Sequence, residues 1–361
     1  RALPEALRRL SDAIGLEGTF QGKAEGRLEI DPDDPRRSSL EYRVTDVRTR
    51  DAGVDFGLAV TGMRAVGELV GRAGPGDVHV LSGDLYIQQA EFNRLDLQGG
   101  HLHYRLGELH PLIHGIIERT ENLPPASYEV PREIRDELLA RPVDRLLQVS
   151  VTSESFYGGQ ANGFLYVDTR DGQGFGGHLV GRNIEVALAS EDVFGHSGDG
   201  VRGEAEGEVR FAGRTGDPKS VTGRGRGAIR DANLATVPLF YQILELLNLG
   251  SKGGVFRELS IPYEIADGRF RSSAIEIASG IVTLRGRGTL SFDGELLLGL
   301  EPEFIPLRLP VVDRVLNVFK RVLSQVQVEG PLSDPRVSLR LVGAEIPLGG
   351  GSGESRRGEE S

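Results

Sequence analysis

The chain has 361 residues, enough for one large or two ordinary domains, and a formal net charge of −11, which argues against a nucleic-acid binder. It has no cysteine, which excludes a disulfide framework and a thiolate zinc site, and no run approaching 18 apolar residues, so we expect no membrane-spanning helix. The sequence begins with Arg1 and shows no signal peptide, so we expect a fragment or processed form whose targeting segment lies upstream.

The first part of the chain predicts one helix followed by short strands. Leu3, Leu7, Leu10 and Ile14 recur at helical spacing, so we expect a helix over Leu3–Leu16. Apolar and polar residues then alternate in short runs separated by Gly, Asp or Asn, as in antiparallel hairpins. These runs lie at 28–30, 42–44, 78–80, 84–88 and 94–98.

Residues 105–148 interrupt the alternation. Leu109, Leu112 and Ile116 belong to a helical stripe, and a second helix is predicted over Pro131–Leu147 after a proline-bearing loop. We therefore expect a helical hairpin inserted into a β protein. Strands then resume, and the run Ile184–Leu188 is predicted to be one of them.

A glycine-alternating phrase occurs several times along the chain. Its versions are Gly22–Leu28, Gly203–Val209, Gly223–Ile229 and the shorter Gly286–Leu290. Small residues take alternate positions in each version, so one face of the strand is nearly bare. We expect this bare face to permit curvature of the sheet or the close approach of another layer.

From Val221 to Pro347 the sequence predicts short alternating strands and two amphipathic helices, Val237–Leu249 and Val311–Ser324. Apolar side chains of these strands fall on one face of a sheet whose other face is wet. The apolar set comprises Leu259, Ile261, Tyr263, Ile265, Ile275, Ile277, Leu296, Leu298, Val337 and Leu339. A second sheet or an apolar ligand could cover this face. We expect the helices to pack on the sheet and close its end; the alternative is that one lies at a membrane surface.

The order of elements between Gly223 and Val342 resembles the C-terminal region of AsmA-like proteins of diderm bacteria, which are related to TamB. No single motif is diagnostic, and the resemblance rests on the ordered series. This series runs through Gly225–Asp231, Val237–Phe240, the leucine-rich helix to Leu249, Phe256–Ile261, Asp267–Gly268, Ser273–Ile277, Gly286–Gly288, Leu290–Gly294 and Gly330–Pro335.

The resemblance implies a mainly β fold in which a long curved antiparallel sheet forms an apolar groove. It also implies a periplasmic protein anchored in the inner membrane by a segment missing from this chain. Its function would be to conduct phospholipid passively between the two membranes, with acyl chains on the apolar set above and no cofactor. We expect β-groove segments at 1–104 and 149–347, the insertion at 105–148 and a disordered tail at 348–361.

Candidates for chemistry are few. His101 and His103 share a strand face, and His110 and His114 lie one helical turn apart, which makes a weak candidate zinc site. No nucleophile elbow, dinucleotide fingerprint or phosphate loop is present, so we expect no enzyme. Two other functions stay open: a structural β-sandwich, and an envelope-assembly chaperone that offers its sheet edges to client strands.

Overall fold

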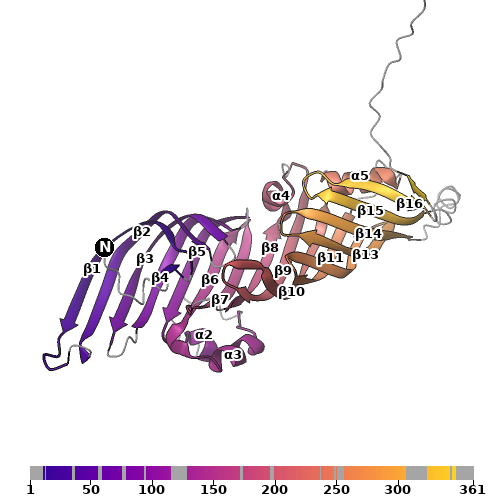
Figure 1. The fold of residues 1–361 in the computed structure, drawn as a ribbon. Coiled ribbons are helices and arrows are strands. Elements are labelled where there is room, and N and C mark those ends of the chain that lie inside the picture. The colour runs from indigo at the N-terminus through magenta and orange to yellow at the C-terminus, as the bar shows by residue number, and fades with distance from the viewer. Residues whose placement is uncertain are drawn as a thin grey trace, which may run out of the picture.

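A computed structural model describes residues 11–12, 14–34, 37–55, 59–74, 79–92, 95–114, 128–170, 174–195, 199–235, 237–247, 249, 256–305, 323–341 and 344–346. Its strands form one antiparallel sheet of seventeen strands, in which each strand pairs with the next along the chain (Figure 1). The expectation of a mainly β protein with one long, curved, open sheet is confirmed.

The first eight strands make up the N-terminal part of the sheet. They are β1 (Glu17–Glu29), β2 (Ser39–Asp55), β3 (Ala59–Ala73), β4 (His79–Phe92), β5 (Leu95–Leu106), β6 (Leu146–Phe156), β7 (Gly159–Asp168) and β8 (Gly174–Glu185). Between β5 and β6 lie the helices α2 (Pro111–His114) and α3 (Arg132–Leu139) and a 3₁₀ turn, Val143–Arg145. The insertion leaves the sheet continuous, because Leu106 of β5 faces Leu147 of β6.

The remaining strands continue the same meander. They are β9 (Arg202–Arg214), β10 (Asp217–Asn233), β11 (Phe256–Ala266), β12 (Arg269–Ser279), β13 (Val282–Ser291), β14 (Glu295–Phe304), β15 (Leu323–Pro331), β16 (Arg336–Leu341) and β17 (Ala344–Ile346). Within the described ranges, two helices interrupt them: α4 (Val186–Phe194) between β8 and β9, and α5 (Pro238–Leu246) between β10 and β11.

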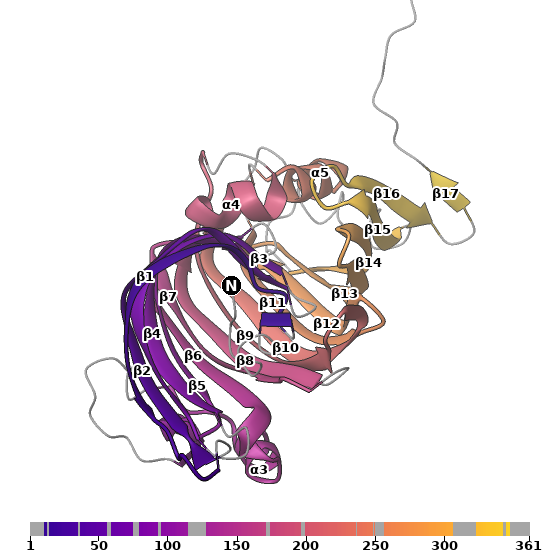
Figure 2. The same cartoon turned by 60° about the vertical axis from the view of Figure 1, so that its left-hand side comes forward.

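The sheet is curled across its width, as Figure 2 shows, and its two faces differ in chemistry. The helices α4 and α5 lie over the hollow, and their apolar residues pack in one cluster with the apolar face of β11–β16. The insertion packs on the opposite face through Phe164 and Tyr166. The apolar, glycine-rich face is therefore the concave one.

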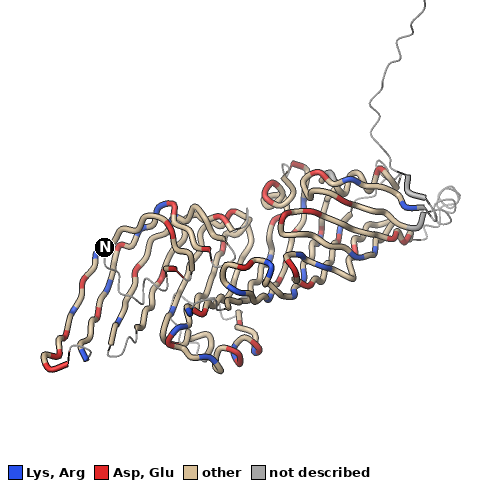
Figure 3. Tube along the Cα trace, in the orientation of Figure 1, with Lys and Arg blue, Asp and Glu red and all other residues tan. Residues whose placement is uncertain are grey.

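The convex face carries the charges. Acidic and basic residues are interspersed along it (Figure 3) and form cross-strand ion pairs, such as Arg226 Nη2–Glu208 Oε2 at 3.3 Å and Arg230 Nη2–Glu206 Oε1 at 2.7 Å. Arg285 bridges Glu276 and Glu303 on its two neighbouring strands. These pairs are solvent-exposed and each contributes at most about 1 kcal/mol. Their main effect is to keep this face in water.

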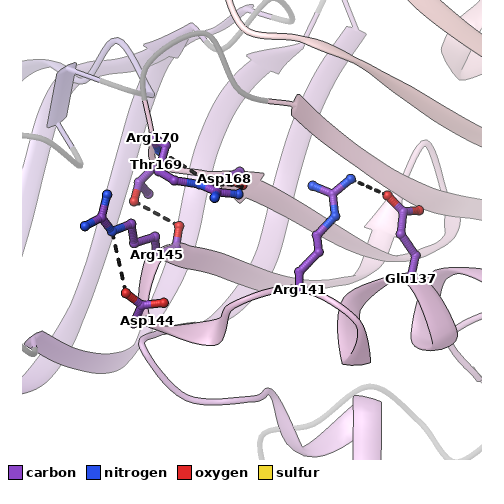
Figure 4. A network of polar contacts seen from close by, with 7 residues as sticks. All are labelled: Glu137, Arg141, Asp144, Arg145, Asp168, Thr169 and Arg170. Atoms are coloured by element: carbon purple, nitrogen blue, oxygen red, sulfur yellow. Dashed lines mark hydrogen bonds and ion pairs between the residues drawn. The ribbon is translucent and has the colours of Figure 1, made fainter.

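The insertion is fixed to the convex face by both apolar and polar contacts. Leu138 of α3 is fully buried, and the Tyr166 hydroxyl donates to Glu137 Oε1 at 3.0 Å. Figure 4 shows Arg141 on Glu137, and beside this pair Arg170 on Asp168 and the Thr169 hydroxyl donating to the carbonyl of Arg145. The polar network ties the end of α3 to the strands beneath it.

Two of the element boundaries predicted from the sequence were wrong. The helix predicted over Pro131–Leu147 ends at Leu139, because the residue before Pro142 is disfavoured in helical conformation, and Leu146 begins β6. The strand predicted at Ile184–Leu188 ends at Glu185, where α4 begins. A short apolar run such as Val186–Ala189 does not distinguish a strand from a buried helix.

Other predicted helices fall partly or wholly outside the described residues. Ser11 and Asp12 are helical, but the rest of the helix predicted over Leu3–Leu16 is largely not described. The predicted helix Val311–Ser324 and the tail at 348–361 also lie outside the described residues, apart from Leu323 and Ser324, which belong to β15. The predicted helix Val237–Leu249 is confirmed as α5, with Pro238 in its first turn. Across the parts of the chain that are described, no helix has the length and apolar character needed to span a bilayer.

Candidate functional site

Rows of facing residues cross the concave face from strand to strand. Residues that face each other on adjacent antiparallel strands share one side of the sheet, so a row runs perpendicular to the strands and along the hollow. One such row, the apolar row, joins β5 to β11 in unbroken register. It consists of Leu102, Val151, Gly163, Leu179, Val209, Gly225 and Tyr263.

A second row runs beside the apolar row, displaced from it by two residues on every strand. From β5 to β10 it contains only small residues. This small-residue row consists of Gly100, Ser153, Ala161, Gly181, Gly207 and Gly227. Strands lie about 4.8 Å apart, so the row is roughly 24 Å long. A Cβ atom added at Gly227 would meet nothing within 4 Å. At Gly181, by contrast, a Cβ atom would lie 2.7 Å from Ile184 Cδ1. We call the small-residue row, which the larger side chains of the apolar row border, the furrow.

Aromatic side chains lie over several glycines on the same face. Tyr42, Tyr104 and Tyr263 each face a glycine of the neighbouring strand, namely Gly71, Gly83 and Gly225. A Cβ atom at Gly225 would lie 2.4 Å from the carbonyl oxygen of Glu208 and 2.6 Å from the Tyr263 ring. Close contact, which we expect at the glycine-alternating phrases, is therefore found at Gly225. It is not found at Gly227, where the space is open.

The concave face is covered by α5 at its C-terminal end; toward the N-terminus it carries two further clusters of buried side chains, one around Phe175 and one around Ile87, together with partly exposed apolar residues. Helix α5 buries Leu239, Phe240, Ile243, Leu244 and Leu247 in the cluster that it shares with β11–β16, which confirms that this helix packs on the sheet. In the apolar row, Leu102, Val151, Leu179, Val209 and Tyr263 stay partly exposed. All strands in the described ranges belong to one sheet, so they supply no second sheet to cover this row.

The residues predicted from sequence to line a groove all lie on this concave face, in two environments. Leu259 faces Ile277, Leu298 faces Val328 of β15, and Val328 faces Val337. Those that are buried are Ile265, Ile275, Ile277 and Leu296; those partly exposed are Leu259, Ile261, Tyr263, Leu298, Val337 and Leu339. Ile275 and Ile277 pack in the α5 cluster and form part of the folded core.

The groove-lining residues predicted from the sequence lie on β11, β12, β14 and β16. The exposed part of the apolar row lies mainly on β5–β9, from which no groove-lining residue was predicted. Its signal was present, because Val149 and Val151 alternate with Gln148 and Ser150 in the sequence. The glycines that face Leu165 and Leu179 weakened this signal, since a glycine carries no hydropathy preference for either face.

The predicted histidine site lies on the convex face under the insertion. His101 Nε2 and His103 Nδ1 contact the same oxygen, Asp84 Oδ1, at 2.8 and 3.1 Å. Their hydrogen bonds hold the pKa of Asp84 far below its ordinary value despite partial burial, which opposes them. His110 is fully buried, with its ring edge-on to His103 at 5.0 Å.

Burial lowers the pKa of His110 to about 3, so its ring is neutral, and its Nδ1 accepts a hydrogen bond from the backbone N–H of Leu112 at 3.2 Å. Among the described residues, no three or more metal-ligating side chains are grouped so that they could hold a metal ion. The side chain of His114 is outside the described set. The hydrogen bonds of His101 and His103 with Asp84 instead join β5 to β4 beneath the insertion.

No family model, no curated protein and no solved structure matches the chain.

Proposed function

We propose that the chain is a passive lipid-binding conduit whose concave face carries phospholipid acyl chains along the small-residue row. The observation that carries this proposal is the furrow of small side chains, bordered by a partly exposed apolar row and crossing from β5 to β10. A bilayer has a hydrocarbon core of about 30 Å, so one leaflet's acyl chains need about 15 Å. The furrow, at roughly 24 Å, accommodates that length.

Binding would be apolar and without a specific headgroup site. Each buried CH₂ contributes about 0.8 kcal/mol, so an acyl chain is held by the length of its contact. Successive positions along the row are chemically similar, since each is Gly, Ala or Ser. This favours sliding over fixed occupancy. The charged convex face keeps the outside of the conduit in water.

The resemblance to AsmA-like proteins completes the proposal. By this resemblance the chain would lie in the periplasm of a diderm bacterium, held at the inner membrane by a segment outside this sequence, and would move phospholipid toward the outer membrane. The series between Gly223 and Val342 that carries this resemblance covers part of β10, α5 and β11–β16.

Site-specific photo-crosslinking tests the proposal. A benzophenone amino acid at Ile261, which is partly exposed on the concave face, is expected to capture phospholipid in cells. The same amino acid at Ser260, on the convex face of the same strand, is the matched control and should capture none. At Ile277 it should capture protein, because that side chain is packed under α5.

Mass spectrometry of the captured species and of an organic extract of the purified protein identifies the lipid. Equal lipid labelling at Ile261 and Ser260, or an extract free of lipid, would contradict the proposal. Lipid capture at Ile277 would instead mean that α5 moves off the sheet.

A further inference from the structure

The strand β1 forms an open edge of the sheet. It pairs with β2 and, within the described part of the chain, with no other strand, and Figure 1 shows it at the end of the sheet. All thirteen of its residues are exposed. An exposed edge presents unpaired backbone N–H and C=O groups that can hydrogen-bond to a strand of another chain.

Apolar side chains are concentrated on this edge. Phe20 and Leu28 are 45% and 59% exposed, and Ile30, which follows the strand, is 68% exposed. Leu28 faces Leu40, and Gly26 faces Tyr42, so the even-numbered residues of β1 lie on the concave face. The odd-numbered residues, including Lys23, Glu25 and Arg27, lie on the convex face.

The sequence of β1 is complementary to itself in an antiparallel register centred on Ala24. With Ala24 opposite the Ala24 of a second copy, Lys23 faces Glu25, and Phe20 faces Leu28. Gln21 then faces Arg27, and Gly22 faces Gly26, so no like charges meet within β1. Opposite charges on facing strands are stabilising and like charges are destabilising.

The two neighbouring registers that keep the concave faces on one side are unfavourable. Centring the pair on Lys23 opposes two lysines and sets Glu17 against Glu29. Centring it on Glu25 opposes two glutamates and sets Lys23 against Arg27. Each therefore places like charges opposite each other, which the register centred on Ala24 avoids. Registers centred on Gly22 or Gly26 also avoid like charges, but only the register centred on Ala24 sets Phe20 opposite Leu28.

We propose that two copies of this chain pair through β1 across a two-fold axis at Ala24, so that one concave face continues into the other. The axis is normal to the sheet, which keeps both apolar faces on the same side. Phe20 of one copy then covers Leu28 of the other at the junction. Lys23, which also contacts Asp46 Oδ2 of its own chain at 2.7 Å, lies between two carboxylates.

Cysteine crosslinking tests the register in a chain that has no cysteine of its own. In an antiparallel pair, directly opposed Cα atoms lie about 4.5–5.5 Å apart, within disulfide range. Ala24→Cys is expected to form a covalent dimer on mild oxidation. Leu28→Cys alone should not, because the two Leu28 positions are eight residues apart in this register, whereas an equimolar mixture of Phe20→Cys and Leu28→Cys should.

Sedimentation of the unmodified chain at tens of micromolar is expected to give the dimer mass. Ala24→Lys sets two ammonium groups on the axis and should give the monomer with an unchanged melting temperature, since residue 24 is exposed. A monomeric unmodified chain, a dimeric Ala24→Lys variant, or equal crosslinking of Ala24→Cys and Leu28→Cys would each overturn the proposal. Lipid capture at Ile261 is measured separately and does not depend on this result.

Discussion

The two ends of the concave face share one sequence pattern but have different surroundings. In β12 and β13, Ile275, Ile277 and Leu284 alternate with polar residues and are at most 4% exposed, because α5 lies over them. In β5 and β6, Leu102 and Val151 alternate in the same way and remain partly exposed. Alternation therefore sets which face is apolar, and α5 makes the C-terminal part of that face core, whereas farther toward the N-terminus buried residues such as Phe175 lie beside partly exposed ones in a cluster that contains no residue of a described helix.

The largest expected effect is at the covered end. Ile243 of α5 is fully buried, so Ile243→Ala removes packed methylenes and should lower the free energy of unfolding by about 2–5 kcal/mol. Denaturant unfolding measures it. The matched control is Leu188→Ala in α4, where the side chain is 53% exposed and a change within about 0.5 kcal/mol is expected. Similar losses for the two variants would show that α5 does not form a core with the sheet.

The next largest effect on stability is expected at a glycine that is crowded by its neighbours, compared with a glycine that is not. Gly225→Val places its side chain against Tyr263 and the Glu208 carbonyl and should cost about 1–3 kcal/mol. Arg226→Val, on the convex face, and Gly227→Ala, where the space is open, are the controls and should cost less. Melting temperatures measure all three. Equal melting temperatures for Gly225→Val and Arg226→Val would refute the crowding at Gly225.

Acid should weaken the open end before the covered end. Burial lowers the pKa of His79, His110 and His178, all on β4–β8 or the insertion, and all seven histidines precede residue 200. The unfolded chain therefore takes up these protons first as the pH falls below about 6.5. Their contribution to stability is complete above that pH and is lost toward pH 3, at about 1.4 kcal/mol per pH unit for each proton.

Hydrogen exchange read by mass spectrometry at pH 7 and pH 5, corrected for intrinsic exchange rates, localises this effect. Protection in β4–β8 should fall at pH 5, whereas protection in β11–β14 should change little. His110→Gln removes one titrating group and should reduce the pH dependence. Uniform loss of protection across the sheet would contradict the assignment to these histidines.

The smallest effect on stability is expected in the apolar row. Leu179 is already partly exposed, so Leu179→Asn should cost only about 1 kcal/mol, while lipid recovered with the purified protein should decrease. Val180→Asn, on the convex face of the same strand, is the control and should leave lipid recovery unchanged. If both variants kept the full amount of lipid, the apolar row would not be the binding surface.

The sequence predicted the sheet well because the alternation of single strands is a local property. Leu259, Ile261 and Ile265 share a face in the structure as they do in the pattern, and α5 begins at the predicted proline. The coverage of Ile277 was not predictable, since it depends on a helix that precedes it by about thirty residues. Nor could the pattern reveal the small-residue row, which exists only when six strands are aligned in register.

Each strand pairs with the strand next to it in the sequence, and this order affects how the chain folds. Most hairpins bring together residues that are close in the sequence, so closing most new pairs requires only a short loop; the longer connections are the insertion and those between β8 and β9, β10 and β11, and β14 and β15. Topologies dominated by such local pairings fold faster than those that join distant segments. A chain of this kind can add one strand at a time to a growing edge as it emerges during synthesis, without waiting for its C-terminus.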